Sequence, residues 1–279
     1  MPSLLILGGL TVDRFPDGRR APGGSVLHAG LAAAAEGLAV ATLTVAGPEP
    51  EAAAGLSRLG QLGDVHRRAA HATTTYRHEE AGGRRVLVYE RAGGAIDPAA
   101  LDGVVTPDVV LLAPIADELP LATLAAVRER LRPPCSVLLI QGWLRRLALG
   151  EPVHPLALDE LPDDLWKAFG TADALVVSTE DLAEAPVDPF TQAREVRSRV
   201  GSRPVLVLTL GERGYLLDDP DSDRIAAVVP RRIVDGVPLV GAGDTFGASL
   251  AVHLAGGLEP PQAAAAAAER VIAVLESRR

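Results

Sequence analysis

The segment Gly241-Ala242-Gly243-Asp244 combines the residue types of an anion-binding turn with an acid at its end. Small residues let backbone amides approach an anion closely, and an apolar, helix-forming run follows from Thr245. A helix that begins there would direct its free N–H groups and the positive end of its dipole at the anion. A carboxylate beside a bound phosphate can act as a general base, so the segment indicates phosphoryl transfer to a hydroxyl, with Asp244 as the base. The alternative is an ordinary strand–turn–helix connection with Asp244 as N-cap.

A second glycine pair, Gly211 and Gly214, follows Thr209 at the end of the apolar run 205–208. Loops of this kind are common phosphate contacts, because they lie at the carboxyl edge of a parallel sheet. A turn that needs positive φ would explain both glycines equally well when they are taken alone. Their position shortly before the segment that ends in Asp244 favours the phosphate-binding role.

Two glycine-containing loops also occur near the N-terminus. Gly23 and Gly24 precede the apolar run 27–36, and Asp13 follows a glycine pair at the end of the first predicted strand. The plainer interpretation is a loop with an N-cap, together with a turn and a solvated aspartate. No histidine pairs at metal-ligand spacing with another histidine or a cysteine, so the five histidines other than His28, His78 among them, are interpreted as surface or packing residues. The sequence has no Gly-x-x-x-x-Gly-Lys-Ser/Thr motif. A kinase built on this chain would therefore not be a P-loop kinase.

The composition limits the class of protein. The net charge of -9 argues against nucleic acid or an anionic membrane as the main partner. A single cysteine, Cys135, excludes an intramolecular disulfide and a cysteine-cluster metal site. No apolar run approaches the length of a membrane span, and residues 4–7 lack the features of a signal peptide. We therefore expect a cytoplasmic protein.

Val-rich runs alternate with Ala- and Leu-rich runs, which favours an α/β fold with a mainly parallel sheet between two helical layers. The predicted strands cover residues 4–7, 39–45, 109–113, 136–140, 174–177 and 205–210, with an antiparallel pair at 215–218 and 225–229. The predicted helices cover residues 27–36, 52–59, 121–131, 163–170, 189–200, 244–255 and 261–275. The alternation runs along the whole chain, which predicts one domain over residues 1–279.

The segment 71–91 differs in character from the α/β alternation around it. Two β-prone runs, 73–76 and 85–89, flank the turn signal Ala81-Gly82-Gly83. We expect a hairpin that acts as a lid across a site. The alternative is an edge hairpin of the main sheet. As a lid it would have unpaired edges, through which the chain could form a homodimer.

Taken together, these residues resemble the ribokinase-like (PfkB) carbohydrate kinase family over nearly the whole chain. The resemblance implies a three-layer ribokinase-like sandwich with a small β lid, Asp244 as catalytic base, and an anion hole at Gly241, Ala242 and Gly243. It implies ATP as phosphate donor, bound at Thr209, Gly211, Gly214 and Ser178. It implies a sugar or polyol substrate, bound at Asp13, Gly23, Gly24, His28 and Arg145. It also implies Mg²⁺, organised through water by Glu180 and Asp181.

Several positions depart from the family's motifs. The Asn that usually precedes the substrate helix is His28, and the central Asp-x-Asn-x-Arg motif reads Gln141, Trp143 and Arg145. The Asn-x-x-Glu motif reads Ser178-Thr179-Glu180-Asp181. The residues at these motif positions are similar to those of a short subgroup of the family that is related to myo-inositol kinases.

The expected function is thus ATP-dependent phosphorylation of a hydroxyl on a small sugar or polyol, and the likeness to the subgroup implies an inositol-like acceptor. Two alternatives stay open. One is a nucleoside or vitamin kinase on the same fold, and the other is a non-catalytic member that binds a sugar or nucleotide.

Overall fold

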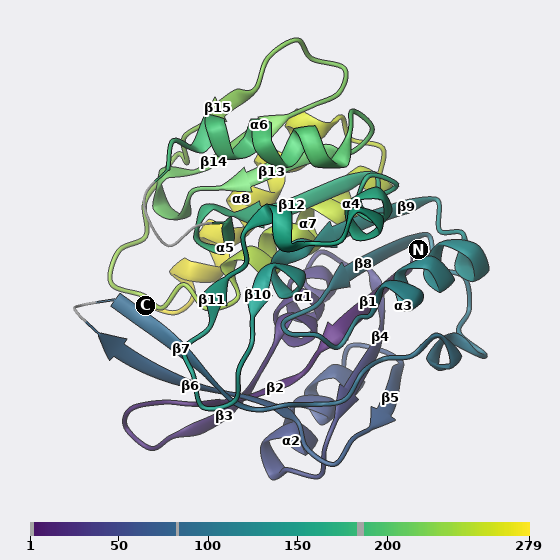
Figure 1. The fold of residues 1–279 in the computed structure, drawn as a ribbon, viewed down its shortest axis with the longest axis vertical. Coiled ribbons are helices and arrows are strands. Elements are labelled where there is room, and N and C mark those ends of the chain that lie inside the picture. Colours follow the sequence, from purple (N-terminus) through teal and green to yellow (C-terminus); the bar gives the residue numbers. More distant parts are fainter. Residues whose placement is uncertain (1–2, 82–83, 183–186) are drawn as a thin grey trace.

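The computed structural model describes residues 3–81, 84–182 and 187–279. A nine-stranded sheet in the order β15-β14-β13-β12-β9-β8-β1-β4-β5 forms its middle layer (Figure 1). The strands from β13 to β5 run parallel, and β14 and β15 extend one edge antiparallel. The bounds are β1 (Ser3–Gly9), β4 (Ala39–Ala46), β5 (Val65–Ala69), β8 (Val109–Ala113), β9 (Cys135–Leu139), β12 (Ala174–Ser178), β13 (Val205–Thr209), β14 (Tyr215–Asp218) and β15 (Ala226–Val228).

Helices cover both faces of this sheet. Residues of α1, α2, α7 and α8 share one apolar cluster with the strands, whereas α3, α4 and α6 share the other. Their bounds are α1 (Ser25–Ala34), α2 (Pro50–Gly60), α3 (Leu121–Ala126), α4 (Asp163–Phe169), α6 (Pro189–Val200), α7 (Ala242–Ala255) and α8 (Pro260–Glu276). The short α5 (Thr179–Leu182) follows β12 directly. The predicted α/β sandwich is confirmed.

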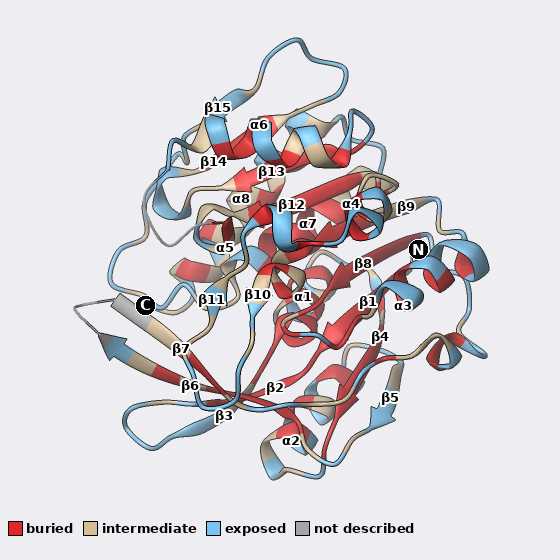
Figure 2. Cartoon of the chain, in the orientation of Figure 1, coloured by how far each residue is buried: buried red, intermediate tan, exposed pale blue. Residues whose placement is uncertain are grey.

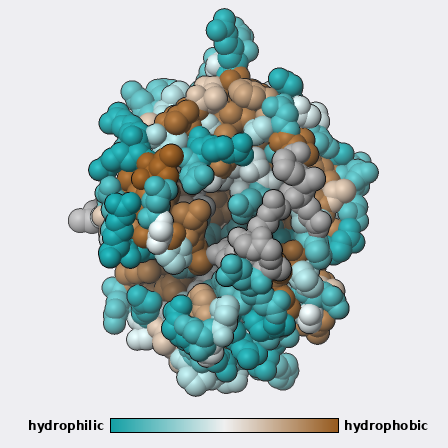
Figure 3. Space-filling model, turned by 90° about the vertical axis from the view of Figure 1, so that its left-hand side faces the viewer, coloured by the Kyte–Doolittle hydropathy of each residue, from teal (hydrophilic) through white to brown (hydrophobic). Residues whose placement is uncertain are grey.

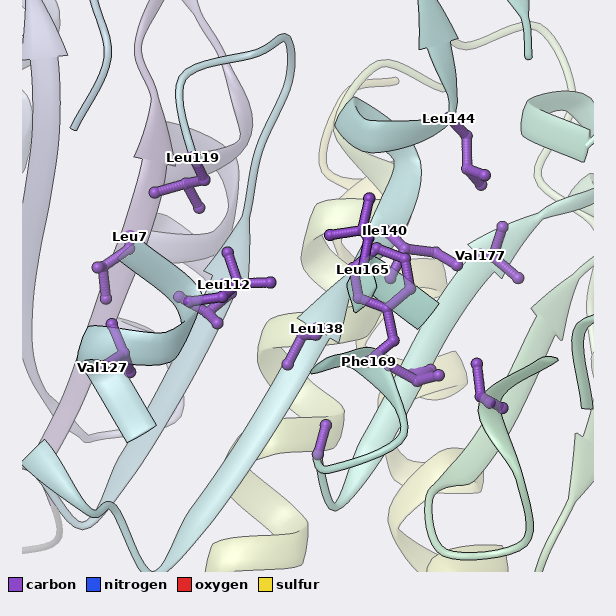
Figure 4. Close-up of a cluster of buried hydrophobic side chains, with 14 of the residues drawn as sticks. Leu7, Leu112, Leu119, Val127, Leu138, Ile140, Leu144, Leu165, Phe169 and Val177 are labelled. Atoms are coloured by element: carbon purple, nitrogen blue, oxygen red, sulfur yellow. The ribbon is translucent and has the colours of Figure 1, made fainter. Parts of the chain in front are cut away.

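The two clusters follow from the alternation of side chains along each strand. Leu4 and Ile6 of β1 belong to the cluster under α1 and α7, whereas Leu5 and Leu7 belong to the opposite one. Both faces are covered, so the inner parallel strands are mostly apolar and lie in the buried interior, whereas β5 at the edge of the sheet is polar and largely exposed (Figure 2). Part of the second cluster, including Leu7 and Leu112, is shown in Figure 4.

A separate four-stranded sheet, in the order β3-β2-β6-β7, forms the lid. It consists of β2 (Thr11–Arg14), β3 (Arg20–Gly23), β6 (Thr74–Ala81) and β7 (Arg84–Arg91). The predicted hairpin is present as β6 and β7, but β6 pairs with β2 and not with the central sheet, so the edge-hairpin alternative is wrong. Of the predicted turn Ala81-Gly82-Gly83, residues 82–83 lie outside the described residues.

The strands that sequence analysis missed are β2, β3, β5 and the short pair β10 (Arg145–Arg146) and β11 (His154–Pro155). Asp13 lies in β2 and is 7% exposed, so the interpretation as a turn with a solvated aspartate is wrong. The short run Thr11–Arg14 becomes a strand because it pairs with β6, a distant segment of the chain. The predicted helix 121–131 is also modified, since α3 ends at Ala126 and continues as a π-helix, Val127–Leu131.

Across the parts of the chain that the structure describes, no helix combines the length and the apolar character needed to cross a bilayer.

Candidate active site

A cavity of about 300 Å³ lies where the carboxyl ends of the central strands meet the lid sheet. Its walls include residues that follow β1, β9, β12 and β13, residues of the lid strands, and the start of α7. Figure 3 views the side of the molecule to which the tip of β6 and the C-terminus point in Figure 1, and apolar residues gather there beside a hollow. The carboxyl edge of a parallel sheet is where open α/β folds bind ligands.

The start of α7 brings the predicted base into this cavity. Gly241 is the N-cap in a left-handed conformation, with φ 76, and Asp244 lies in the first turn of the helix, 7% exposed. The N-cap interpretation of Asp244 is therefore wrong. Helix geometry leaves the N–H groups of Gly243 and Asp244 without an intrahelical carbonyl. The N–H of Ala242 already donates to the carbonyl of Leu239 at 3.0 Å.

The Asp244 carboxylate is held by a side chain from the opposite wall. Gln141 follows β9 in a 3-10 helix, Ile140–Leu144, and its Nε2 donates to Asp244 Oδ1 at 3.1 Å. The same amide nitrogen donates to Ser25 Oγ at 3.0 Å, at the first residue of α1. Three segments far apart in the sequence therefore converge on the acid.

Arg145 occupies the floor of the cavity beside Gln141. Its guanidinium donates to the Ile115 carbonyl at 2.8 Å and to Gln141 Oε1 at 3.5 Å, and it lies 3.8 Å from Asp181 Oδ1. Burial raises the pKa of Asp181, and the positive charge of Arg145 opposes that shift. The hydroxyl of Tyr76 donates to the same Ile115 carbonyl at 2.8 Å. Arg145 is thus fixed in place by both the lid and the central sheet.

The loop that carries the Ile115 carbonyl is ordered by a buried carboxylate. Glu118 is 1% exposed, and its two oxygens accept the N–H groups of Ile115 and Ala116, each at 2.8 Å. Burial raises the pKa of Glu118. Gln in its place would turn one acceptor into a donor that faces an N–H group.

We therefore expect Glu118→Gln to lower the free energy of unfolding by about 1–3 kcal/mol, since one buried N–H group loses its acceptor. Urea denaturation measures this change. The exposed Glu160, which pairs with Arg146, supplies the matched control Glu160→Gln, with an expected loss below about 1 kcal/mol. Equal denaturation curves for wild type and Glu118→Gln would contradict the structural role of Glu118.

The lid end of the cavity has a polar pair. Asp13 Oδ1 accepts the hydroxyl of Thr11 at 3.0 Å, and its Oδ2 lies 3.5 Å from His78 Nε2. That nitrogen is buried and has no hydrogen-bond partner among the described residues. The ring of His78 stacks on Phe15 with centroids 4.7 Å apart. His78 was interpreted from the sequence as a surface or packing residue, but it lines the cavity.

The glycines and the histidine predicted for substrate binding lie against this end. A side chain at Gly23 would overlap Asp13, whose Oδ2 lies 2.3 Å from the ideal Cβ position, so only glycine leaves the carboxylate in place. Gly24 is the N-cap of α1 and lines the cavity, as does His28. The ring of His28 packs directly against Gly241.

The opposite end of the cavity lies beyond α7. Thr209 ends β13, and Ser178 ends β12. Gly211 begins a short 3-10 helix and Gly214 is its C-cap, and both glycines have positive φ. These four residues all line the cavity. An apolar wall faces them, formed by Pro230, Ile233, Val234, Leu239, Ala268, Val271, Ile272 and Leu275.

The two carboxylates predicted for Mg²⁺ differ in their surroundings. Asp181 is engaged by Arg145, whereas Glu180 is exposed at the cavity wall. Within residues 3–81, 84–182 and 187–279, no group of three or more His, Cys, Asp or Glu side chains could hold a metal ion. Mg²⁺ commonly binds through one or two carboxylates together with substrate phosphates, and such a donor set fits Glu180 and Asp181.

All the residues predicted from the sequence lie in or beside this one cavity, with Gly23 behind Asp13. Their individual roles stay predictions. Sequence reasoning missed Ser25, Thr11, His78 and Glu118, and it noted Gln141 only as a departure from a motif. The available signals were a histidine within the predicted hairpin segment and a glutamine directly after a predicted strand.

Comparisons with known proteins bear on the whole chain. The model of the pfkB family carbohydrate kinases matches residues 11–270. No curated protein matches the sequence. Among solved structures, a pyrophosphate-dependent kinase of the ribokinase family, complexed with a pyrophosphate analog and myo-inositol, superimposes with TM-score 0.78 at 19% identity, covering 95% of this chain and 92% of that one.

Two sugar kinases superimpose over nearly their full lengths. The Arabidopsis thaliana ribokinase complexed with ribose and ATP has TM-score 0.70 at 18% identity, covering 99% of each chain. The fructokinase from Vibrio cholerae has TM-score 0.71 at 20% identity, covering 100% of each chain. At these identities the likeness shows the fold.

Proposed function

This chain belongs to the pfkB family of carbohydrate kinases, and from that premise we propose that it phosphorylates a hydroxyl of a small sugar or polyol, with ATP as donor. The observation that carries the proposal is the buried Asp244 at the start of α7, beside unpaired helix N–H groups and within one cavity. Burying a carboxylate beside an anion-binding site costs stability. A role as acceptor of the proton from the hydroxyl that attacks the phosphate would account for its position. The expected acceptor is inositol-like.

In the proposed reaction, Asp244 accepts the proton of the acceptor hydroxyl while that oxygen forms a bond to the γ-phosphorus. The bond from the γ-phosphorus to the bridging oxygen breaks, and ADP leaves. The N–H groups of Gly243 and Asp244, at the start of α7, stabilise charge on the transferred group. Glu180 and Asp181 would hold the water shell of Mg²⁺, which neutralises phosphate charge when it is bound.

The donor end of the cavity favours a nucleotide. The aliphatic wall that faces Thr209, Gly211 and Gly214 offers an apolar surface to a purine ring, and pyrophosphate has no apolar part to fill it. Pyrophosphate is a second candidate, because one of the most similar solved structures is described as pyrophosphate-dependent. A donor panel of ATP and pyrophosphate, each with a panel of polyols and sugars, separates the two.

The proposal is tested by phosphate transfer to myo-inositol, ribose, fructose and glycerol, detected as the phosphorylated product. A nucleoside panel run in parallel tests the nucleoside-kinase alternative, for which a base would need a place near the lid. Calorimetric binding of ATP without transfer to any acceptor would support the non-catalytic alternative and overturn the kinase proposal.

His78 is expected to contact the acceptor, since its buried Nε2 faces the cavity beside Asp13. Replacement by an apolar side chain of similar size, His78→Leu, removes one hydrogen bond and should raise KM for the acceptor about 3- to 10-fold, while KM for the donor stays constant. Initial rates at varied acceptor concentration measure it. The exposed His71 supplies the control His71→Leu. An unchanged acceptor KM in His78→Leu would remove His78 from the substrate site.

We propose a cytoplasmic protein that forms a homodimer through the lid. One lid edge is already covered, because the backbone of β7 pairs with residues 150–153. The outer edge of β3 is the remaining lid edge for such a contact. Light scattering, with and without the substitution Ala21→Pro in β3, measures the oligomeric state.

A further inference from the structure

The contacts of Gln141 assign it a role that the sequence motifs do not. We propose that Gln141 is a positioning residue, which fixes the orientation of the Asp244 carboxylate and separates that carboxylate from Arg145. The inference rests on the proposed function of Asp244 as base.

The orientation of the Gln141 amide is set by its neighbours. Arg145 has only N–H donors, so the group that faces it must be the oxygen Oε1, at 3.5 Å. The amide nitrogen is therefore directed at Ser25 Oγ and at Asp244 Oδ1, at 3.0 and 3.1 Å. With Oδ1 occupied by this donor, Oδ2 is the oxygen left to accept a proton from a hydroxyl.

The turn that carries Gln141 is rigid. Gly142 packs so closely under the backbone of Pro114 and Ala116 that a Cβ there would lie 2.7 Å from carbonyl oxygens. Trp143 Nε1 donates to the Leu119 carbonyl at 2.7 Å. The 3-10 helix is thus held on both sides of its chain, and the Gln141 side chain is projected from a fixed point. Positioned bases need this kind of support, because small displacements reduce turnover strongly.

The amide also keeps a cation from the base. Direct contact between Arg145 and Asp244 would stabilise the carboxylate and weaken it as a proton acceptor. Gln141 lies between them, and Arg145 instead pairs with the carboxylate of Asp181 and the Ile115 carbonyl. A neutral side chain with a donor on one side and an acceptor on the other satisfies both neighbours without adding charge.

The first test is kinetic. Gln141→Met keeps the length of the side chain and removes both polar atoms, so we expect kcat to fall about 10- to 100-fold, with KM for donor and acceptor within about twofold. The acidic limb of the pH–rate profile should move to higher pH, because the carboxylate loses a donor that favours its charged form. Gln141→Glu keeps an acceptor for Arg145 but places a second negative charge beside Asp244. The acidic limb should therefore move to a still higher pH.

A matched control variant makes this test specific. Gln192→Met is a buried substitution of the same type on α6, outside the cavity, and should leave kcat and the limb unchanged. The other titratable and charged groups around Asp244 are the same in wild type and variants, and they include His28 on α1, Arg145 on β10, Glu180 and Asp181 on α5, and Asp13 and His78 on the lid. If Gln141→Met does not fold, Gln141→Glu carries the test.

The second test does not depend on turnover. With ¹³C-aspartate labelling, the carboxyl resonance missing from Asp244→Asn identifies Asp244, and its titration is followed in unliganded wild type and Gln141→Met. A midpoint at higher pH in Gln141→Met supports the proposal. An unchanged midpoint, or a rise in acceptor KM with constant kcat, overturns it. Loss of the proposed function itself would appear differently, as a wild type that transfers no phosphate.

Discussion

Asp244→Asn should lower kcat about 10²- to 10⁴-fold while leaving the fold intact, because the amide cannot accept the hydroxyl proton. The substitution preserves shape, and the Asn oxygen can still accept the hydrogen bond from Gln141 that now holds Oδ1 at 3.1 Å. Removal of a carboxylate from a half-closed, apolar-walled cavity carries little cost in stability. The measurements are single-turnover phosphate transfer, thermal unfolding, and calorimetric ATP binding.

The matched control is Asp223→Asn, which is the same chemical change at an exposed loop position. It should leave turnover and unfolding unchanged. If Asp244→Asn retained turnover near that of wild type, the assignment of Asp244 as base would be wrong, and the cavity would need another proton acceptor.

Gly241→Ala should lower turnover about 10²- to 10³-fold, because it disturbs the backbone donors at the start of α7. The ideal Cβ at this position lies 2.3 Å from Cγ of His28, and the residue has φ +76, where a Cβ is strained. The turn or the histidine must therefore move. The positive φ alone should cost about 1–2 kcal/mol of stability, and the contact with His28 adds to it.

A glycine just beyond the C-terminal end of α7 separates the effect of backbone strain from that of side-chain contact. Gly257 follows the other end of the helix with φ +81, and a Cβ there meets nothing within 4 Å. Gly257→Ala should show the strain cost without loss of turnover. The double variant Gly241→Ala/His28→Ala removes the overlap and should recover part of the stability. Equal losses in Gly241→Ala and Gly257→Ala would show that the close packing on His28 has no consequence.

The sequence predicted the fold class and the elements of the central sandwich well. Alternating apolar strand and helix patterns are local signals. The observed strands and helices follow them because helices cover both faces of the sheet. The lid was predicted only in part. β6 and β7 are β-prone by composition, whereas β2 becomes a strand through pairing with β6, and no pattern within Thr11–Arg14 contains that information.

The same division applies to the candidate site. Two motifs could be found from the sequence because each consists of residues that are neighbours along the chain: the turn at Gly241 and Asp244, and the glycines after Thr209. Gln141 and His78 could not be assigned, because their partners Asp244 and Asp13 lie on other elements.

By itself, then, the sequence determined the glycine-containing turn at residues 241–243, the acid beside it and the α/β layers, since each depends on conformational preferences and hydrophobic periodicity within short segments. Only the tertiary structure decided which side chain meets that acid, the amide of Gln141, and which groups hold that amide in turn, the hydroxyl of Ser25 and the guanidinium of Arg145. The physical reason is that hydrogen bonds and ion pairs act over a few ångströms in space. Those distances arise only after strands from distant parts of the chain are aligned at one edge of the sheet.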